Sequence, residues 1–282
     1  MLNNTYFVKL IRSSYLRLYS IFEPIFRLSE TEKEGDFLKS TYFKFLLSPT
    51  VKLPYKLGRS IRGTKFDSSK DIYSKVVTEI LRNKSLDEIT KMLYDEYQDF
   101  KYKSVSDINN FLNSSKIISY PSWLMVLPWD NSEINSLKKN YLLSFYKNRS
   151  ANGMSFTDKK LEHIEERIFS YDTARSHVHQ FKGLINKIQH QGYIENNSDY
   201  PTAVILVKNN KWRWIMSSSG NHRAHIKKEL TFNCINCKVS GIVNFSKLNR
   251  QKNVVNEIFN EEEAAVLFEN VFEGKVPIRG PI

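Results

Sequence analysis

The segment TAVILVKNNKWRWIMSSSGNHR, residues 202–223, decides the fold of this 282-residue chain. Thr202 to Val207 is a compact run of β-favouring side chains, Asn209-Asn210 is a turn dipeptide, and Trp212 to Met216 is a second β-rich run. Two such runs around a short turn predict a β-hairpin. Helix signals begin after Gly220, so the segment predicts a strand, a turn, a strand and a helix in succession.

The turn that leads into this helix has the residues of an anion site. Gly220 permits a tight turn and a close approach of backbone to a ligand. The first N–H groups of a helix lack intrahelical acceptors and favour an anion, and Arg223 can hold phosphate oxygens in a bidentate fork. His222 can donate to a phosphate or exchange a proton near neutral pH, and Ser219 adds a hydroxyl. The other interpretation is a structural turn in which Arg223 forms a salt bridge and His222 caps a local group.

The first 117 residues are expected to be mostly helical. Apolar residues recur at helical spacing from Asp71 to Asn83, and Ser85 with Glu88 forms a predicted capping box for a second helix. The character of the sequence changes near Ile117, where Ile117-Ile118 and Trp123 to Leu127 look like strands. Pro128-Trp129-Asp130 follows.

The rest of the chain alternates helix and strand signals. Residues 131–170 are polar and are expected to be an insertion. A helix is predicted from about Thr173 to Gln191, ended by Gly192, and Phe232 to Phe245 is strand-like. Asn260 is expected to cap a last helix, with Glu263 at its capping-box position. We therefore expect an α+β fold, with a basic helical region over residues 1–117 and a mixed-sheet domain over residues 118–282.

The stretch from Ile118 to Phe245 resembles the ParB/sulfiredoxin fold superfamily. Three motifs carry the resemblance: Leu127-Pro128-Trp129-Asp130, the helix-glycine-strand step that runs through Gly192 and Tyr193, and Ser219-Gly220-Asn221-His222-Arg223. The resemblance implies a small mixed-sheet domain. It also implies a phosphate-binding or nucleotide-binding site formed by Ser219, Gly220, Asn221, His222 and Arg223.

The motif Ser219 to Arg223 is closest to the free serine kinase branch of that superfamily, whose motif is Asp-Gly-His-His-Arg. That branch places a catalytic carboxylate just after the proline that ends the first strand, a place that Asp130 occupies, with Glu133 close by. The resemblance thus implies a nucleotide (ATP, ADP or CTP), Mg²⁺, phosphoryl transfer to a small hydroxylated acceptor, and Asp130, Glu133 and His222 as catalytic residues. Ser219 replaces the aspartate of the family motif, so the acceptor is not carried over. For Asp130 the alternative is a helix N-cap.

Other branches of the superfamily supply the alternative function. Sulfiredoxin has a cysteine where this chain has Asn221, which disfavours cysteine repair. A ParB-like, nucleotide-switched protein that binds nucleic acid without small-molecule chemistry remains the alternative. The formal charge of +12 and pI of about 9.4 favour an anionic partner of either kind.

A basic and aromatic segment runs from Phe37 to Phe66. It contains seven basic residues and no acid: Lys39, Lys44, Lys52, Lys56, Arg59, Arg62 and Lys65. Such a segment suits a polyanion, a glycan or an anionic membrane surface, and a solvated basic face is the other interpretation. Tyr6 to Leu28 is predicted to be an amphipathic helix, either in a membrane interface or packed on its own protein.

The two cysteines, Cys234 and Cys237, are too few for a disulfide framework and favour a reducing compartment, so we expect a cytoplasmic protein with a membrane surface as the alternative. Zinc ligation by these cysteines with His222 and His225 is disfavoured. If the cysteines lie on a strand, their odd spacing places them on opposite faces. We expect no metal-ligating protein site.

Overall fold

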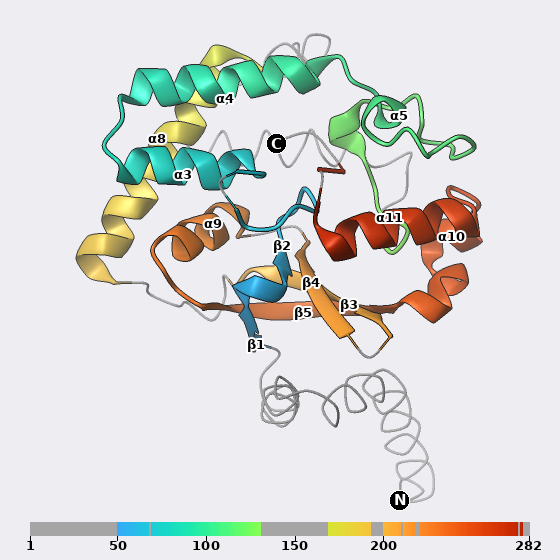
Figure 1. Cartoon of the computed structure of the whole chain (residues 1–282). Coiled ribbons are helices and arrows are strands. Elements are labelled where there is room, and N and C mark those ends of the chain that lie inside the picture. The colour runs from blue at the N-terminus through green and yellow to red at the C-terminus, as the bar shows by residue number, and fades with distance from the viewer. Residues whose placement is uncertain are drawn as a thin grey trace, which may run out of the picture.

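A computed structural model describes residues 50–67, 69–130, 169–192, 200–209, 211–217, 220–275 and 277–278. Helices and a single mixed sheet together form an α+β fold (Figure 1). The elements in chain order are β1 (Thr50–Pro54), the 3-10 turn η1 (Tyr55–Leu57), β2 (Gly58–Arg59), α3 (Ile72–Leu81), α4 (Leu86–Lys101), α5 (Val105–Ile108), the 3-10 turn η2 (Ser122–Leu124), α8 (Tyr171–Gln191), β3 (Thr202–Lys208), β4 (Lys211–Met216), α9 (Asn221–Glu229), β5 (Cys234–Asn244), the 3-10 segment η4 (Phe245–Arg250), α10 (Lys252–Val255) and α11 (Glu261–Glu273).

The five strands form one mixed sheet in the order β1-β5-β3-β4-β2. The predicted hairpin is confirmed: β3 and β4 pair antiparallel from Ala203 opposite Met216 to Lys208 opposite Lys211. Asn209 takes the left-handed conformation (φ 47°) that a tight hairpin turn favours. β5 runs parallel to β3 and antiparallel to β1, so the connection through α9 carries the chain across the hairpin.

The expectation of strands at Ile117-Ile118 and at Trp123 to Leu127 is wrong. Residues Ser122–Leu124 form the 3-10 turn η2, and the run from Trp123 to Leu127 is buried along its whole length without joining the sheet. A short run of consecutive apolar residues does not distinguish a buried strand from a buried irregular segment. The sheet instead takes β1 and β2 from residues 50–59, where the sequence favoured a loop. Residues on both sides of the boundary expected at 117/118 therefore contribute strands to one sheet.

The helix predictions agree with the structure better than the strand predictions do. Asp71 caps α3, accepting hydrogen bonds from the N–H groups of Tyr73 and Ser74. Asn260 and Glu263 form the expected capping box of α11. Ser85 is the N-cap of α4, as expected, but its side chain makes no cap hydrogen bond. The predicted capping box with Glu88 is therefore absent. Gly192 ends α8 with φ 72° and ψ 172°, an extended positive-φ conformation that glycine adopts without a Cβ clash.

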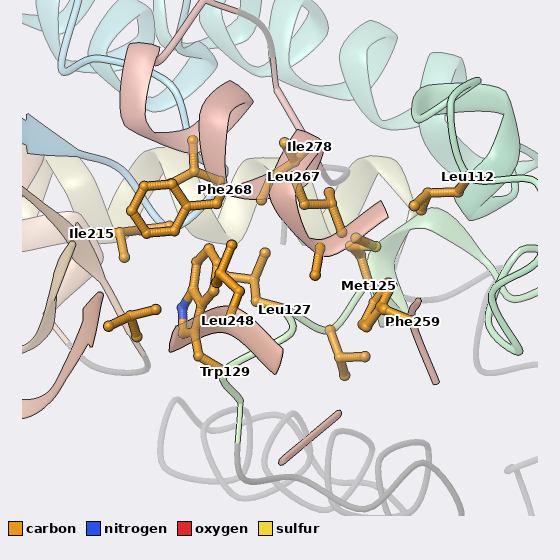
Figure 2. Close-up of a cluster of buried hydrophobic side chains, with 14 of the residues drawn as sticks. Leu112, Met125, Leu127, Trp129, Ile215, Leu248, Phe259, Leu267, Phe268 and Ile278 are labelled. Carbon is orange, nitrogen blue, oxygen red and sulfur yellow. The ribbon is translucent and has the colours of Figure 1, made fainter. Parts of the chain in front are cut away.

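The alternation of side chains divides the core between the two faces of the sheet. Ala203 and Ile205 of β3 face the cluster that contains Ala224 of α9, whereas Leu206 faces the cluster that contains Phe268 of α11. Figure 2 shows this second cluster, in which Leu127 and Trp129 pack beside Phe268 and Ile215. The segment expected to be a strand thus covers the sheet rather than extending it.

A helical layer lies beyond α9. Side chains of α3, α4 and α8 form a third cluster with Ile226 of α9, and Figure 1 shows α9 between these helices and the strands. α9 is therefore packed between the sheet, through Ala224, and the helices α3, α4 and α8, through Ile226. This packing holds its first turn in place.

Several predicted features lie outside the described residues: the amphipathic stretch Tyr6 to Leu28, Lys39 and Lys44 of the basic segment, Glu133, Tyr193 and Ser219. The insertion expected at 131–170 is described only at Phe169 and Ser170. No helix in the described parts of the chain is both long and apolar enough to cross a bilayer.

Candidate functional site

The first turn of α9 has the geometry that the sequence predicted for the glycine. Gly220 is the N-cap and adopts the left-handed conformation, with φ 81°. A Cβ atom at this position would lie 2.6 Å from the Cβ and Cγ atoms of Pro201, closer than real Cβ contacts come. Only glycine fits both the conformation and the space, so the chain turns sharply from the strand β4 side into α9.

This helix start is electrostatically suited to an anion. Its N-cap, Gly220, has no side chain to cap it, and among the described residues its first turn contains no acidic residue. The first N–H groups of a helix carry partial positive charge, which Arg223 in the same turn reinforces. Asn221, His222 and Arg223 are all half-buried. The structure therefore brings these three predicted residues and Gly220 into one turn, as the sequence required.

The His222 ring packs among aromatic rings of α3 and α8. Its ring lies 4.5 Å from the ring of Phe181, 5.6 Å from that of Tyr73 and 5.5 Å from that of His177, measured between ring centroids. Removal from water, and then the nearby His225, lower the pKa of His222 from 6.5 to about 4. The imidazole is therefore neutral at pH 7. The expectation that it exchanges a proton near neutral pH is wrong, because its aromatic surroundings disfavour the charged form.

His177 of α8 also belongs to this cluster. It is half-buried, and its Nδ1 atom lies 2.5 Å from the hydroxyl of Tyr97 on α4. The apolar stripe of α8 predicts which of its residues face the core. It does not predict that His177, beside the stripe, contacts Tyr97 of α4. The sequence therefore gave no signal for the contact with His222.

Behind the first turn of α9 lies a buried polar network that the sequence analysis also missed. His225 is fully buried, with Nδ1 2.9 Å from Ser74 Oγ and Nε2 3.5 Å from Asp71 Oδ1. Thr64 donates to Asp71 from the loop after β2 (2.7 Å). The order of Asp, His and Ser resembles a hydrolase triad, but Ser74 and His225 have no exposed surface, so no substrate reaches them. The network instead joins α9 to α3 and to the loop at residues 60–64.

Charge controls the protonation of this network. Burial raises the pKa of Asp71, but His225, Arg62 and the hydroxyl donors Ser60 and Thr64 together bring it below its usual value. Burial lowers the pKa of His225 despite the opposing effect of Asp71. Asp71, the N-cap of α3, and His225 are thus coupled, and the pKa of each group is lowered from its ordinary value.

Two arginines of the basic segment 37–66 are core residues. Arg59 is 2% exposed and donates to the carbonyls of Val271 and Phe272 at the end of α11. Arg62 is equally buried and pairs with Glu96 at 3.0 Å. These two side chains are therefore not available to a polyanion. Their partners lie far away in the sequence, so the residues next to Arg59 and Arg62 do not show that these two side chains are buried.

Asp130 lies apart from this site. Its carboxylate accepts a hydrogen bond from the N–H of Leu127 (2.8 Å) and so closes a turn. Its neighbour Trp129 packs in the cluster under α11 (Figure 2). Leu127, the other end of this turn, lies in the same cluster, which covers the sheet face opposite α9. The structure thus supports a structural role for Asp130 in the turn and does not bring it to His222.

The cysteines have the arrangement that their spacing predicted. Both lie on β5; Cys237 is buried against the α9 face of the sheet, and Cys234, three positions before it, is half-buried. An odd step along a strand reverses the face, so the two thiols point away from each other.

Comparison with known proteins gives no relative for the chain. No family model, curated protein or solved structure matches it.

Proposed function

We propose that the chain binds a phosphate-bearing ligand at the first turn of α9 and transfers a phosphoryl group from a nucleotide to a small hydroxylated acceptor. The observation that carries the proposal is the start of α9, where Gly220 turns on Pro201 and the first turn contains Arg223 and no acidic residue. The resemblance of this motif to the kinase branch of the ParB/sulfiredoxin superfamily supports the reaction class. The proposal places the protein in the cytoplasm, where nucleotides are present.

The described residues supply positioning and charge rather than a strong base. Phosphoryl transfer proceeds through a loose transition state, so positioning and electrostatic stabilisation provide most of the catalysis. Backbone N–H groups of α9 and the Arg223 guanidinium would stabilise charge on the transferred group. A neutral His222 can donate one N–H to a ligand oxygen without adding charge.

Mg²⁺ is not held by this turn. Protein-bound Mg²⁺ usually has one or two carboxylate ligands together with substrate phosphates and water. The first turn of α9 contains no carboxylate, and Asp130 lies in a separate turn. The protein residues at the site therefore do not fit a resident magnesium ion, and the ion would arrive with the nucleotide.

A nucleotide screen by thermal shift tests the proposal. ATP, ADP and CTP would each be added, with and without Mg²⁺, to the wild-type chain, to Arg223→Ala and to Lys211→Ala as a matched control. Lys211 is an exposed cation at the hairpin end of β4. We expect one nucleotide to raise the melting temperature of the wild type and of Lys211→Ala but not of Arg223→Ala.

The alternative function gives a different outcome in the same experiment. A nucleic-acid binder would bind duplex with an affinity that falls steeply between about 50 and 200 mM salt. Tight, salt-sensitive duplex binding without any nucleotide effect would refute the phosphotransferase proposal. Consumption of the stabilising nucleotide with a panel of small hydroxylated acceptors, lost in Arg223→Ala, would establish the reaction.

A further inference from the structure

A hollow of about 450 Å³ lies at the surface of the helical layer, between α4 and the start of α8, two helices that Figure 1 shows side by side. Its lining residues among those that the structure describes are Asp87, Glu88, Lys91, Tyr94, Asp95 and Tyr171. The volume lies within the range of sites for small molecules. These residues belong to α4 and α8, so the hollow is separate from the first turn of α9 on which the proposed function depends.

Two tyrosines form the aromatic part of the hollow. Tyr94 of α4 packs against the core cluster of α3, α4 and α8, whereas Tyr171, the first residue of α8, is 36% exposed. Their ring centroids lie 5.5 Å apart with the ring planes at 69°, which is an edge-to-face pair. The face of an aromatic ring carries partial negative charge and attracts ammonium and guanidinium groups. The tyrosines therefore suit both the apolar and the cationic parts of a ligand.

Carboxylates line the hollow at two separate places along α4. Glu88 lies in the first turn of the helix and Asp95 lies seven residues later, which corresponds to about 10 Å along the helix axis. The helix dipole explains an acid in the first turn but not Asp95, which lies beyond that turn. The hollow thus combines two separated anionic groups with an aromatic surface.

The cations already present do not neutralise the hollow. Lys91 pairs with Asp95 at 2.8 Å, and Arg175 lies 3.7 Å from Asp87. All four of these side chains are more than half exposed, and exposed ion pairs contribute little because water and salt screen them. Within the described part of the chain, Glu88 has no cationic partner. An incoming cation can therefore reach Glu88 directly and can displace Lys91 from Asp95.

We propose that this hollow binds an aliphatic polyamine. One ammonium group contacts Glu88 and another contacts Asp95 in place of Lys91, and the methylene groups lie along the two tyrosines. The inference goes beyond the proposed function and does not depend on it. A ligand whose positive charges are separated by methylenes matches two separated carboxylates beside an aromatic surface. A monovalent amine would contact only one of the two carboxylates, and an anion would be repelled by both.

Calorimetric titration of the whole chain with spermidine, at low ionic strength, tests the inference. One variant combines Glu88→Gln with Asp95→Asn and so removes both proposed ionic contacts. A second, Tyr171→Ala, removes one aromatic ring, and Tyr171→Phe keeps the ring as its conservative counterpart. Each variant is first checked for a melting temperature close to that of the wild type.

Two matched controls change the same residue types outside the hollow. Glu261→Gln combined with Glu262→Gln removes two exposed acids from the first turn of α11. Tyr102→Ala removes the exposed tyrosine that follows α4. The first control alters the net charge of the chain as much as the double variant in the hollow does.

The expected result depends on the position of the change rather than on charge alone. The double variant Glu88→Gln with Asp95→Asn should weaken spermidine binding by about tenfold or more, because two ion pairs are lost. Tyr171→Ala should weaken it by about threefold, as loss of one cation–π contact does, and Tyr171→Phe should not. Both controls should stay within about twofold of the wild type. Butylamine, a monovalent amine, should bind the wild type about tenfold more weakly than spermidine.

Three results would overturn the inference. The first is that the wild type shows no saturable spermidine binding. The second is that the double variant and its α11 control weaken binding equally, since spermidine would then respond only to net charge. The third comes from titration with a tetra-arginine peptide: if the peptide binds at the hollow and spermidine does not, the hollow is a docking surface for a basic protein segment. None of these results bears on the first turn of α9, so the proposed function is tested separately.

Discussion

Gly220→Ala should destabilise the protein by an amount that the structure allows us to estimate. An alanine at φ 81° costs about 1–2 kcal/mol relative to glycine. Its Cβ atom would lie 2.6 Å from two Pro201 side-chain atoms and 3.0 Å from Pro201 Cα, and such overpacking costs about 1–3 kcal/mol. We expect a loss of about 2–5 kcal/mol, which for a chain of this size lowers the melting temperature by on the order of 10 °C.

A second substitution separates the two contributions. Asn tolerates the left-handed conformation better than Ala but carries the same Cβ atom. If the contact with Pro201 dominates, Gly220→Asn should therefore be nearly as destabilising as Gly220→Ala. The difference between the two variants measures the backbone contribution.

Gly183→Ala is the control, because Gly183 lies in α8 and a Cβ atom there would meet nothing within 4 Å. Alanine in a helix interior is favoured over glycine by roughly 0.5–1 kcal/mol, so this variant should be slightly stabilised. Urea and thermal unfolding followed by circular dichroism would compare all three. A melting temperature for Gly220→Ala within about 1 °C of the wild type would refute the placement of Gly220 against Pro201.

Three further predictions concern buried groups elsewhere. The pKa of His222 is lowered from 6.5 to about 4, so between these two pH values the unfolded chain binds a proton at His222 that the folded chain does not. The free energy of unfolding should therefore fall as the pH drops from about 6.5 to about 4. His222→Gln should reduce this pH dependence, and His179→Gln, at an exposed position, should leave it unchanged. Arg59→Met should cost about 3 kcal/mol or more in urea unfolding, since it leaves the last-turn carbonyls of α11 without their buried donor, and an equally stable variant would contradict this. Glu263→Gln should cost about 2 kcal/mol, because this carboxylate accepts from its own N-cap and from N–H groups of a neighbouring loop, whereas the exposed Glu262→Gln should be neutral by the same measurement.

Local signals predicted the elements that depend on local chemistry. The hairpin at Asn209, the glycine turn at Gly220 and the cap of α11 at Asn260 each follow from a few adjacent residues. Their energies come from backbone conformation and short-range hydrogen bonds, which the sequence encodes directly. The candidate anion site could be predicted for this reason, since it lies within a single turn.

Contacts between residues far apart in the chain decided which segments joined the sheet and which charged side chains were buried. The run Trp123 to Leu127 is apolar enough for a strand, yet it packs as an irregular segment, and β1 supplies the edge strand instead. Arg59 resembles a surface cation in the sequence and becomes a core residue only because α11, more than two hundred residues later, presents its carbonyls to it. Asp130 was predicted as a catalytic carboxylate, but the packing of Leu127 and Trp129 in the cluster under α11 places it in a turn on the other face of the sheet from α9.

The sequence by itself determined that Gly220, His222 and Arg223 share one turn at the start of a helix, because residues so close in the chain cannot separate. Only the tertiary structure decided that His222 lies among aromatic rings and is neutral, and that Tyr94 of α4 and Tyr171 of α8 line one hollow. Protonation depends on which groups remove water from a side chain, and the hollow depends on how two helices pack. Both are set by contacts between residues far apart in the chain, and a local pattern does not contain them.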